Sequence, residues 1–220
     1  LPFNGRSRRK VIWYFPEIWV ILYLQLNYRT MNRKIDLRIG ILGLLVFSVA
    51  LSRLLPHPPN FTPVGAMGLF GAAYFSRKYL AFLVPFVAMW VSDLILNNAV
   101  YAQLYPEFYN GFYWFGNGWT YAAFGLIVLL GFTVLKKVNV PRLLGASLAA
   151  SVLFFLITNF GSWLADPVYP KNASGLLTAY TAGVPYFWNT LFGDLTFTAV
   201  LFGAFELAQR RYPQLRLQQA

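Results

Sequence analysis

The sequence predicts an all-α membrane protein, a bundle of six transmembrane helices with both termini in the cytoplasm. Three observations lead to this prediction. Of the 220 residues, 58% are hydrophobic and only 11% are charged, whereas about a quarter of the residues of a soluble domain are charged. From residue 31 onward, six apolar stretches follow one another. The gaps between them alternate between basic and nearly charge-free, which is typical of cytoplasmic and external loops.

The Lys and Arg residues are concentrated in alternate gaps. They lie before the first apolar stretch and after the second, fourth and sixth: Arg33, Lys34, Arg38, Arg77, Lys78, Lys136, Lys137, Arg142, Arg210, Arg211 and Arg216. The other three gaps contain only Arg53 and Lys171. Because cytoplasmic loops keep the Lys/Arg excess, the pattern assigns both ends of the six-span region to the cytoplasm. Contact with anionic lipid then explains the net charge of +11, so the expected partners include the lipid bilayer and exclude nucleic acid.

Residues 1–30 precede the bundle and are expected to be either an extension upstream of the natural start or a segment in the membrane interface. Met31 begins the sequence Met-Asn-Arg-Lys, followed by an apolar span, as in many bacterial inner-membrane proteins. The apolar segment 11–26 is short and has basic residues on both sides, which disfavours a crossing. In the interfacial alternative, three aromatic residues would lie at headgroup depth: Trp13, Tyr14 and Trp19.

Six segments are assigned as spans, since crossing the hydrocarbon core takes roughly 17 to 25 helical residues. They are residues 39–55, 61–75, 79–96, 114–135, 143–164 and 186–207. The second is short and contains three glycines. Together they form a transmembrane domain, residues 31–211, followed by a cytoplasmic tail, residues 212–220. Two outer connections, 97–113 and 165–185, are long. The absence of an internal repeat disfavours an inverted-repeat transporter.

Polar side chains within or beside the spans gather in the outer half of the predicted bundle. Charged groups inside a membrane are costly and are therefore functional candidates. Eight residues are assigned to a substrate site in this half: Asn60, Asp93, Asn117, Trp119, Asn159, Trp163, Asn189 and Asp194. Aromatic walls with a few hydrogen-bonding groups are the usual composition of a small-molecule pocket. We therefore expect a substrate pocket that opens on the extracytoplasmic side.

Other interpretations remain open for these residues. Asp93 and Asp194 could hydrogen-bond to neighbouring helices and hold the bundle together, or they could carry protons or cations. Trp163 could belong to an aromatic belt at the outer interface. The chain has no cysteine, and His57 is its only histidine, so no thiolate or histidine metal centre is expected. No cofactor and no enzymatic activity are predicted.

A motif at the start of the second span resembles that of an uncharacterised bacterial family of putative transport proteins. The residues that carry the resemblance are Asn60-Phe61-Thr62-Pro63-Val64-Gly65-Ala66, Leu69-Phe70-Gly71-Ala72, Phe75-Ser76-Arg77-Lys78 and the segment from Pro85 to Leu94. The resemblance covers residues 32–211. That family is similar to the substrate-binding S components of energy-coupling-factor (ECF) vitamin transporters. This similarity implies an S-component-like bundle with an outer pocket closed by loops.

The resemblance also implies partners. S components deliver a micronutrient to a shared transmembrane coupling subunit driven by two cytoplasmic ATPases, and this chain has no Walker motif of its own. They often dock through small residues spaced four apart on the first helix, where this chain offers Ser48 and Ser52. We therefore expect a bacterial inner-membrane protein that binds a small micronutrient for uptake. The alternatives are a proton- or cation-coupled transporter or channel, and an envelope scaffold without a ligand.

Overall fold

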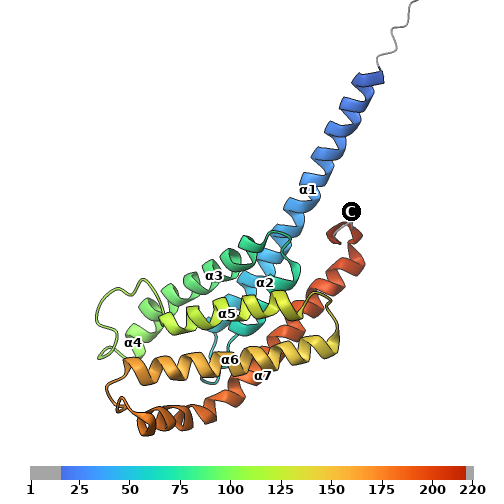
Figure 1. Ribbon diagram of the computed structural model, residues 1–220. Helices are drawn as coiled ribbons and strands as arrows, with labels where there is room; N and C mark the ends of the chain where they lie inside the picture. The colour runs from blue at the N-terminus through green and yellow to red at the C-terminus, as the bar shows by residue number, and fades with distance from the viewer. Residues whose placement is uncertain (1–15, 217–220) are drawn as a thin grey trace, which may run out of the picture.

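The computed structural model describes residues 16–216, and these residues form helices joined by turns and loops (Figure 1). The main helices are α1 (Pro16–Leu51), α2 (Val64–Tyr74), α3 (Lys78–Ile95), α4 (Ala102–Leu104), α5 (Gly118–Val134), α6 (Val140–Ala165) and α7 (Ala173–Arg211). Short 3-10 turns, Ser52–Leu54 and Pro213–Leu215, follow α1 and α7, and a π-helical segment, Leu96–Tyr101, joins α3 to α4. No strand occurs among the described residues, so the all-α prediction is confirmed.

Each predicted span contains one helix, but only four helical segments of the described chain are long and apolar enough to cross a membrane. They are Leu37–Leu54, Lys78–Leu104, Val140–Ala165 and Ala173–Arg211. Such segments are typical of a membrane protein. Helices α2 and α5 are apolar but have only 11 and 17 residues. At the helical rise of 1.5 Å per residue, α2 extends about 16 Å, roughly half the hydrocarbon thickness.

The short helix α2 lies in the centre of the bundle. It contacts α1, α3, α5, α6 and α7, and its residues from Val64 to Gly71 are all buried. Close packing requires small residues here. A Cβ at Gly71 would lie 2.7 Å from the carbonyl oxygen of Ala81 on α3. The neighbouring helices therefore enclose α2, and Phe70 at its centre packs edge-on against Phe202 of α7.

Two helix boundaries differ from the sequence prediction for local reasons. α2 begins at Val64 rather than at residue 61, because Pro63 disfavours a helical conformation at Thr62 directly before it. α7 begins at Ala173, well before the predicted residue 186. Asn172 caps it by accepting a hydrogen bond from the backbone N–H of Gly175 at 2.9 Å. The helix continues through Pro185, so part of the expected loop 165–185 is helical.

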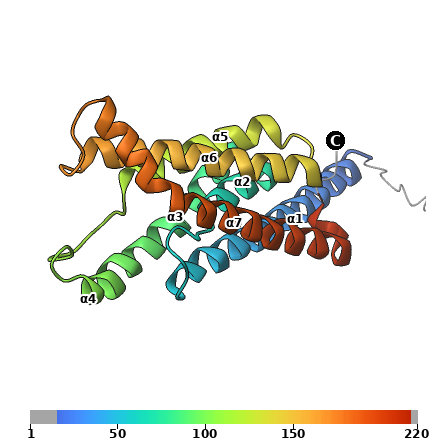
Figure 2. The same cartoon turned by 90° about the horizontal axis from the view of Figure 1, so that it is seen from below.

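The two ends of the bundle differ (Figure 2). One end carries α4 and the long connections, and the other carries the upstream part of α1 and the C-terminal end. α1 is continuous from Pro16 and projects beyond the bundle (Figure 1), so residues 16–30 are helical. Residues 1–15 of the expected upstream segment, and 217–220 of the expected tail, lie outside the described residues.

The chain just after α7 is anchored at the second end by Arg38 of α1. The Arg38 guanidinium donates to the carbonyl oxygens of Leu215 and Tyr74, the latter at 2.9 Å, and lies 5.1 Å from the Phe205 ring centroid. Because Tyr74 ends α2, the cation also faces the negative end of that helix dipole. The start of the expected tail is therefore packed against the bundle, with Leu215 fully buried.

Candidate functional site

Two adjoining cavities lie at the end of the bundle that carries α4 and the long connections. The first, here called the α6–α7 cavity, has a volume of about 420 Å³ and is bounded by residues of α5, α6 and α7. The second, here called the tyrosine cavity, has about 470 Å³ and is lined by residues near the end of α1 and by Tyr101, Tyr105 and Tyr109. Three residues line both cavities and form a shared wall: Asn60, Thr120 and Phe154.

Asn60 enters the wall from the loop between α1 and α2. Its φ of 63° lies in the left-handed region, which Asn adopts more readily than most residues. The backbone N–H of Phe61 donates to the carbonyl of Pro58 at 3.0 Å and closes the turn around it. Asn189 on α7 donates to the carbonyl oxygen of Pro59 at 2.9 Å. The loop is therefore held to α7 immediately before Asn60.

The shared wall contains polar groups that have no partner inside the described chain. The side-chain amide of Asn60 and the hydroxyl of Thr120 make no hydrogen bond there, although other polar side chains around them do. Asn159 donates to the carbonyl of Phe155 and Thr158 to that of Phe154, both at 2.8 Å. Unpaired donors and acceptors beside a cavity are the groups that a ligand or water can satisfy.

Asn117 and Asn159 frame the α6–α7 cavity from two helices. Asn117 caps α5, because its Oδ1 accepts a hydrogen bond from the backbone N–H of Trp119 at 2.9 Å. Asn159 points toward α7 at a position where only glycine fits. A Cβ at Gly183 would overlap the Oδ1 of Asn159. The glycine therefore creates the space that the amide occupies between α6 and α7.

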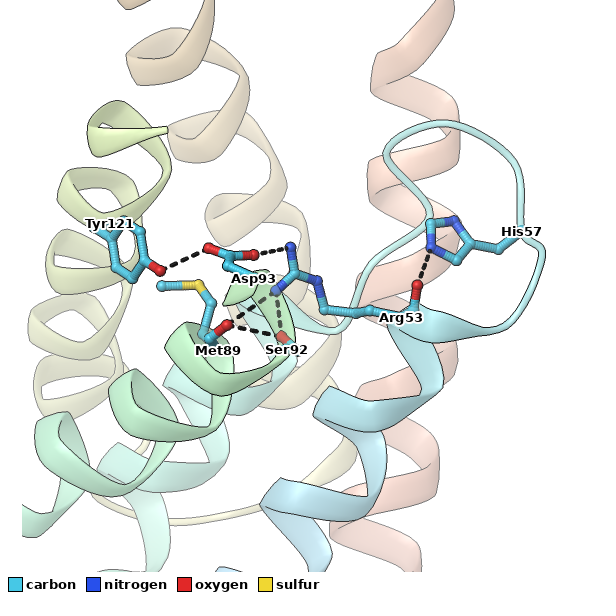
Figure 3. A network of polar contacts seen from close by, with 6 residues as sticks. All are labelled: Arg53, His57, Met89, Ser92, Asp93 and Tyr121. Carbon is cyan, nitrogen blue, oxygen red and sulfur yellow. Dashed lines mark hydrogen bonds and ion pairs between the residues drawn. The ribbon is translucent and has the colours of Figure 1, made fainter. Parts of the chain in front are cut away.

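A buried ion pair, drawn in Figure 3, involves Arg53, one of the residues that line the tyrosine cavity. Arg53, which lines this cavity, contacts the Asp93 carboxylate of α3, with Nη2 2.7 Å from Oδ1. The Tyr121 hydroxyl of α5 donates to the other carboxylate oxygen at 2.6 Å. Arg53 also donates to the Ser92 hydroxyl at 2.6 Å, and its own carbonyl oxygen contacts His57 at 3.2 Å. The charge of Arg53 is therefore neutralised by Asp93 where it meets the cavity.

The tyrosine side of this cavity is neutral. Tyr101 and Tyr109 pack with their ring centroids 5.5 Å apart, and Tyr113 lies 5.1 Å beyond Tyr109. Burial raises the pKa of the Tyr109 hydroxyl, and Tyr101, Tyr113 and Asp93 act in the same direction. Tyr109 therefore stays protonated at neutral pH, so its hydroxyl can both donate and accept hydrogen bonds.

Asp194 lies deeper, where it joins three helices. Its carboxylate accepts hydrogen bonds from the Ser151 hydroxyl of α6 at 2.8 Å and from the backbone N–H of Ala66 in α2 at 3.2 Å. Ala66 belongs to the first turn of α2, whose free N–H groups and dipole favour a negative charge. These hydrogen bonds correspond to one of the interpretations left open by the sequence, in which Asp194 bonds to neighbouring helices and holds the bundle together.

Comparison with protein families identifies the chain. The model of a family of unknown function, DUF6580, matches residues 33–215. The chain belongs to this family. The expected membership of an uncharacterised family is thereby confirmed, while the finding contains no link to ECF S components. Comparisons with curated proteins and with solved structures give no match. Both cavities and the ion pair lie within the DUF6580 region.

Three of the eight predicted site residues line the α6–α7 cavity in this DUF6580 protein: Asn60, Asn117 and Asn159. The other five surround the cavities and make structural contacts. Asp93, Asp194 and Asn189 make the polar contacts given above. The Trp119 ring covers Gly161 and packs edge-on against Phe160. Trp163 donates from its indole N–H to the carbonyl of Pro170 at 2.9 Å, within the connection between α6 and α7.

Several lining residues were not among the predicted site residues. Arg53 lies at the outer end of the first assigned span, and the three cavity tyrosines come from the outer connection 97–113. Thr120, Thr158 and Thr190 come from inside the spans. A lone Arg in a nearly charge-free outer gap was the available signal for Arg53, since such a charge needs a buried partner or a ligand. Threonines carry a weaker signal, because they commonly bond to their own helix, as Thr158 and Thr190 do.

Proposed function

We propose that this protein is a multi-pass bacterial inner-membrane protein that binds a small micronutrient on the extracytoplasmic side, as the substrate-binding subunit of an importer. The observation that carries the proposal is the wall shared by the two cavities. Asn60 and Thr120 bring polar groups without intramolecular partners to this wall, beside Phe154 and the neutral tyrosines. Polar groups converging on a cavity of several hundred Å³ are typical of a small-molecule site.

The charge distribution supports an extracytoplasmic position of the cavities. Two basic residues lie at the cavity end in the described chain: Arg53, which pairs with Asp93, and Lys171. The loops and helix ends at the opposite end carry the clustered bases, including Lys136, Lys137 and Arg211. By the positive-inside rule the cavity end faces out. In this topology α2 and α5 complete six spans, although the other helices enclose α2.

The engagement of both intramembrane aspartates favours ligand binding over ion coupling. Asp93 is paired with Arg53 and Tyr121, and Asp194 accepts from Ser151 and the first turn of α2. A carboxylate that binds and releases protons or cations has to be exchangeable with water. The unpartnered groups of the shared wall are amide and hydroxyl groups instead, which suit a neutral hydrogen-bonding ligand.

A shared transmembrane coupling subunit with cytoplasmic ATPases is the proposed partner. The exposed face of α1 that carries Leu44, Ser48 and Leu51 is available for docking. We expect mild detergent extraction of the tagged protein to co-purify an ATPase and a second membrane subunit. Substitution of Ser48 with Trp should abolish this co-purification. Val46 is fully buried in the bundle, so its substitution would disturb helix packing and is not a suitable control. Leu148→Trp, on the exposed face of α6, is the matched control.

The binding function is tested by extracting small molecules from purified protein in nanodiscs and identifying them by mass spectrometry. We expect one metabolite to be enriched on the wild type and reduced about tenfold on Thr120→Val, since losing one hydrogen bond to a ligand costs about 1 to 1.5 kcal/mol. Thr133→Val is the matched control, because Thr133 lies on the same helix, is exposed and bonds only to Leu130. Equal enrichment on an unrelated membrane protein would refute the proposal.

A further inference from the structure

The lining of the α6–α7 cavity carries information about the charge of its ligand. Of the 15 described residues that line it, none is Asp, Glu, Lys, Arg or His. The nearest ion pair, Arg53 with Asp93, lies beyond the shared wall and is internally neutral. A charged ligand would therefore give up part of its hydration without meeting a counter-charge, which is unfavourable.

The remaining charges at this end of the bundle are also engaged or distant. The Lys171 ammonium donates to the carbonyl oxygens of Trp163, Asp166 and Tyr169 at 2.6, 2.6 and 3.1 Å. Three such bonds use all the donors of an ammonium group. The Asp166 carboxylate accepts from the backbone N–H of Val168. Glu107 is exposed on the connection after α4 and lines neither cavity.

The lining instead combines amides and hydroxyls with aromatic rings. Asn60 offers both a carbonyl oxygen and an NH₂ group, whereas Asn117 uses its Oδ1 to cap α5 and Asn159 donates from its Nδ2 to Phe155. The NH₂ group of Asn117 and the carbonyl oxygen of Asn159 remain, so the three side chains together can match a ligand group that both donates and accepts. Phe155 and Phe187 pack with centroids 5.5 Å apart and planes at 74°, and they present ring surfaces to the cavity. A planar ring bearing a carboxamide has the complementary shape and polarity.

We infer that the α6–α7 cavity takes an uncharged planar ring compound with a carboxamide-like hydrogen-bonding group and rejects its carboxylate and ammonium analogues. This inference rests on the proposed binding function and specifies its substrate class. Selection follows from desolvation: the neutral amide exchanges water for asparagine side chains, whereas either ion loses water without a charge in return.

The test uses benzamide, benzoate and benzylamine, three rings of nearly equal size that differ in charge. Saturation-transfer NMR with the protein in nanodiscs, calibrated by titration, gives an affinity for each. We expect benzamide to bind about tenfold more tightly than both ions. In Asn117→Asp the order should change in favour of benzylamine, because the new carboxylate supplies the missing counter-charge. Asp caps a helix as well as Asn does, so α5 remains intact in this variant. Thr133→Val should behave as wild type.

The co-purified metabolite provides a second, independent reading. A metabolite that is neutral at pH 7 supports the inference, and a charged one overturns it. Wild-type binding of benzoate or benzylamine as tight as that of benzamide also overturns it, while leaving the proposed binding function intact. If none of the three probes binds and no metabolite co-purifies, both the inference and the proposed function fail.

Discussion

Asn189 on α7 donates a hydrogen bond from its Nδ2 to the carbonyl oxygen of Pro59, at 2.9 Å, across 130 positions of the chain. Pro59 directly precedes Asn60, whose left-handed backbone forms part of the wall between the two cavities. The last long helix of the bundle therefore fixes the position of a loop that follows the first.

Replacing Asn189 with Ala removes this donor and frees the loop. We expect ligand affinity to fall about fivefold, the equivalent of one neutral hydrogen bond of about 1 kcal/mol. The affinity of the co-purified metabolite for the variant measures the effect. Thr181→Val on the same helix is the control, since Thr181 is exposed and bonds only to Leu177. Unchanged affinity in Asn189→Ala would show that the loop keeps its position without α7.

Replacing Gly183 with Ala places a methyl group where the Asn159 amide lies. We expect the amide to be displaced and ligand affinity to fall by about tenfold, because the polar group is misplaced and not merely weakened. Gly203→Ala on the same helix is the control, since a Cβ there meets nothing within 4 Å. In an Asn159→Ala background the Gly183→Ala change should cost little further affinity, as coupled neighbours are non-additive. Additive losses would contradict the proposed contact.

Removing one member of the Arg53–Asp93 pair should destabilise the protein strongly. Both side chains are largely buried, at 11% and 8% exposure, so Asp93→Ala leaves an uncompensated charge, which costs about 3 to 5 kcal/mol. The double variant Arg53→Met, Asp93→Asn should recover most of this loss, because it removes both charges and keeps an acceptor for Tyr121. Thermal unfolding in detergent measures both variants. A double variant no more stable than Asp93→Ala would contradict the argument.

Asp194 should act through hydrogen bonding and not through ion transport. Asp194→Ala leaves the first turn of α2 and the Ser151 hydroxyl without their acceptor, and we expect a loss of about 2 to 3 kcal/mol in unfolding free energy. Asp194→Asn keeps one acceptor oxygen and should lose less. Liposomes containing only this protein should show no proton or sodium flux above that of empty liposomes. A flux that Asp194→Asn abolishes would favour the ion-coupled alternative.

The proposed topology can be tested without first removing native thiols, because the chain contains no cysteine. Val168, in the connection between α6 and α7, and Lys137, between α5 and α6, are both exposed. We expect a membrane-impermeant maleimide to label Val168→Cys in intact cells, and Lys137→Cys only after permeabilisation. The reverse pattern would place the cavities on the cytoplasmic side.

Apolar periodicity and charge were sufficient to identify the helices, because they depend on local composition and loop chemistry. The contacts that build the site could not be predicted in this way, because they join residues from distant segments. Asp93 was visible as an intramembrane charge, yet its partner Arg53 lies at the end of the first span, 40 positions earlier in the chain. Asp194 was visible too, but its partner is a backbone N–H group of α2, which any sequence possesses. The early start of α7 depends on one capping residue, Asn172, within a segment otherwise rich in loop formers.

The enclosure of α2 has a consequence for the order in which the chain is assembled. Since α2 is about half the length needed to cross a bilayer, it gains little from lipid alone during synthesis. Its first turn finds a carboxylate partner on α7, which leaves the ribosome after helices α1 to α6. A nascent chain that ends before Asp194 therefore holds α2 with its leading N–H groups unsatisfied. Synthesis of α7 therefore supplies the acceptor for the first turn of α2.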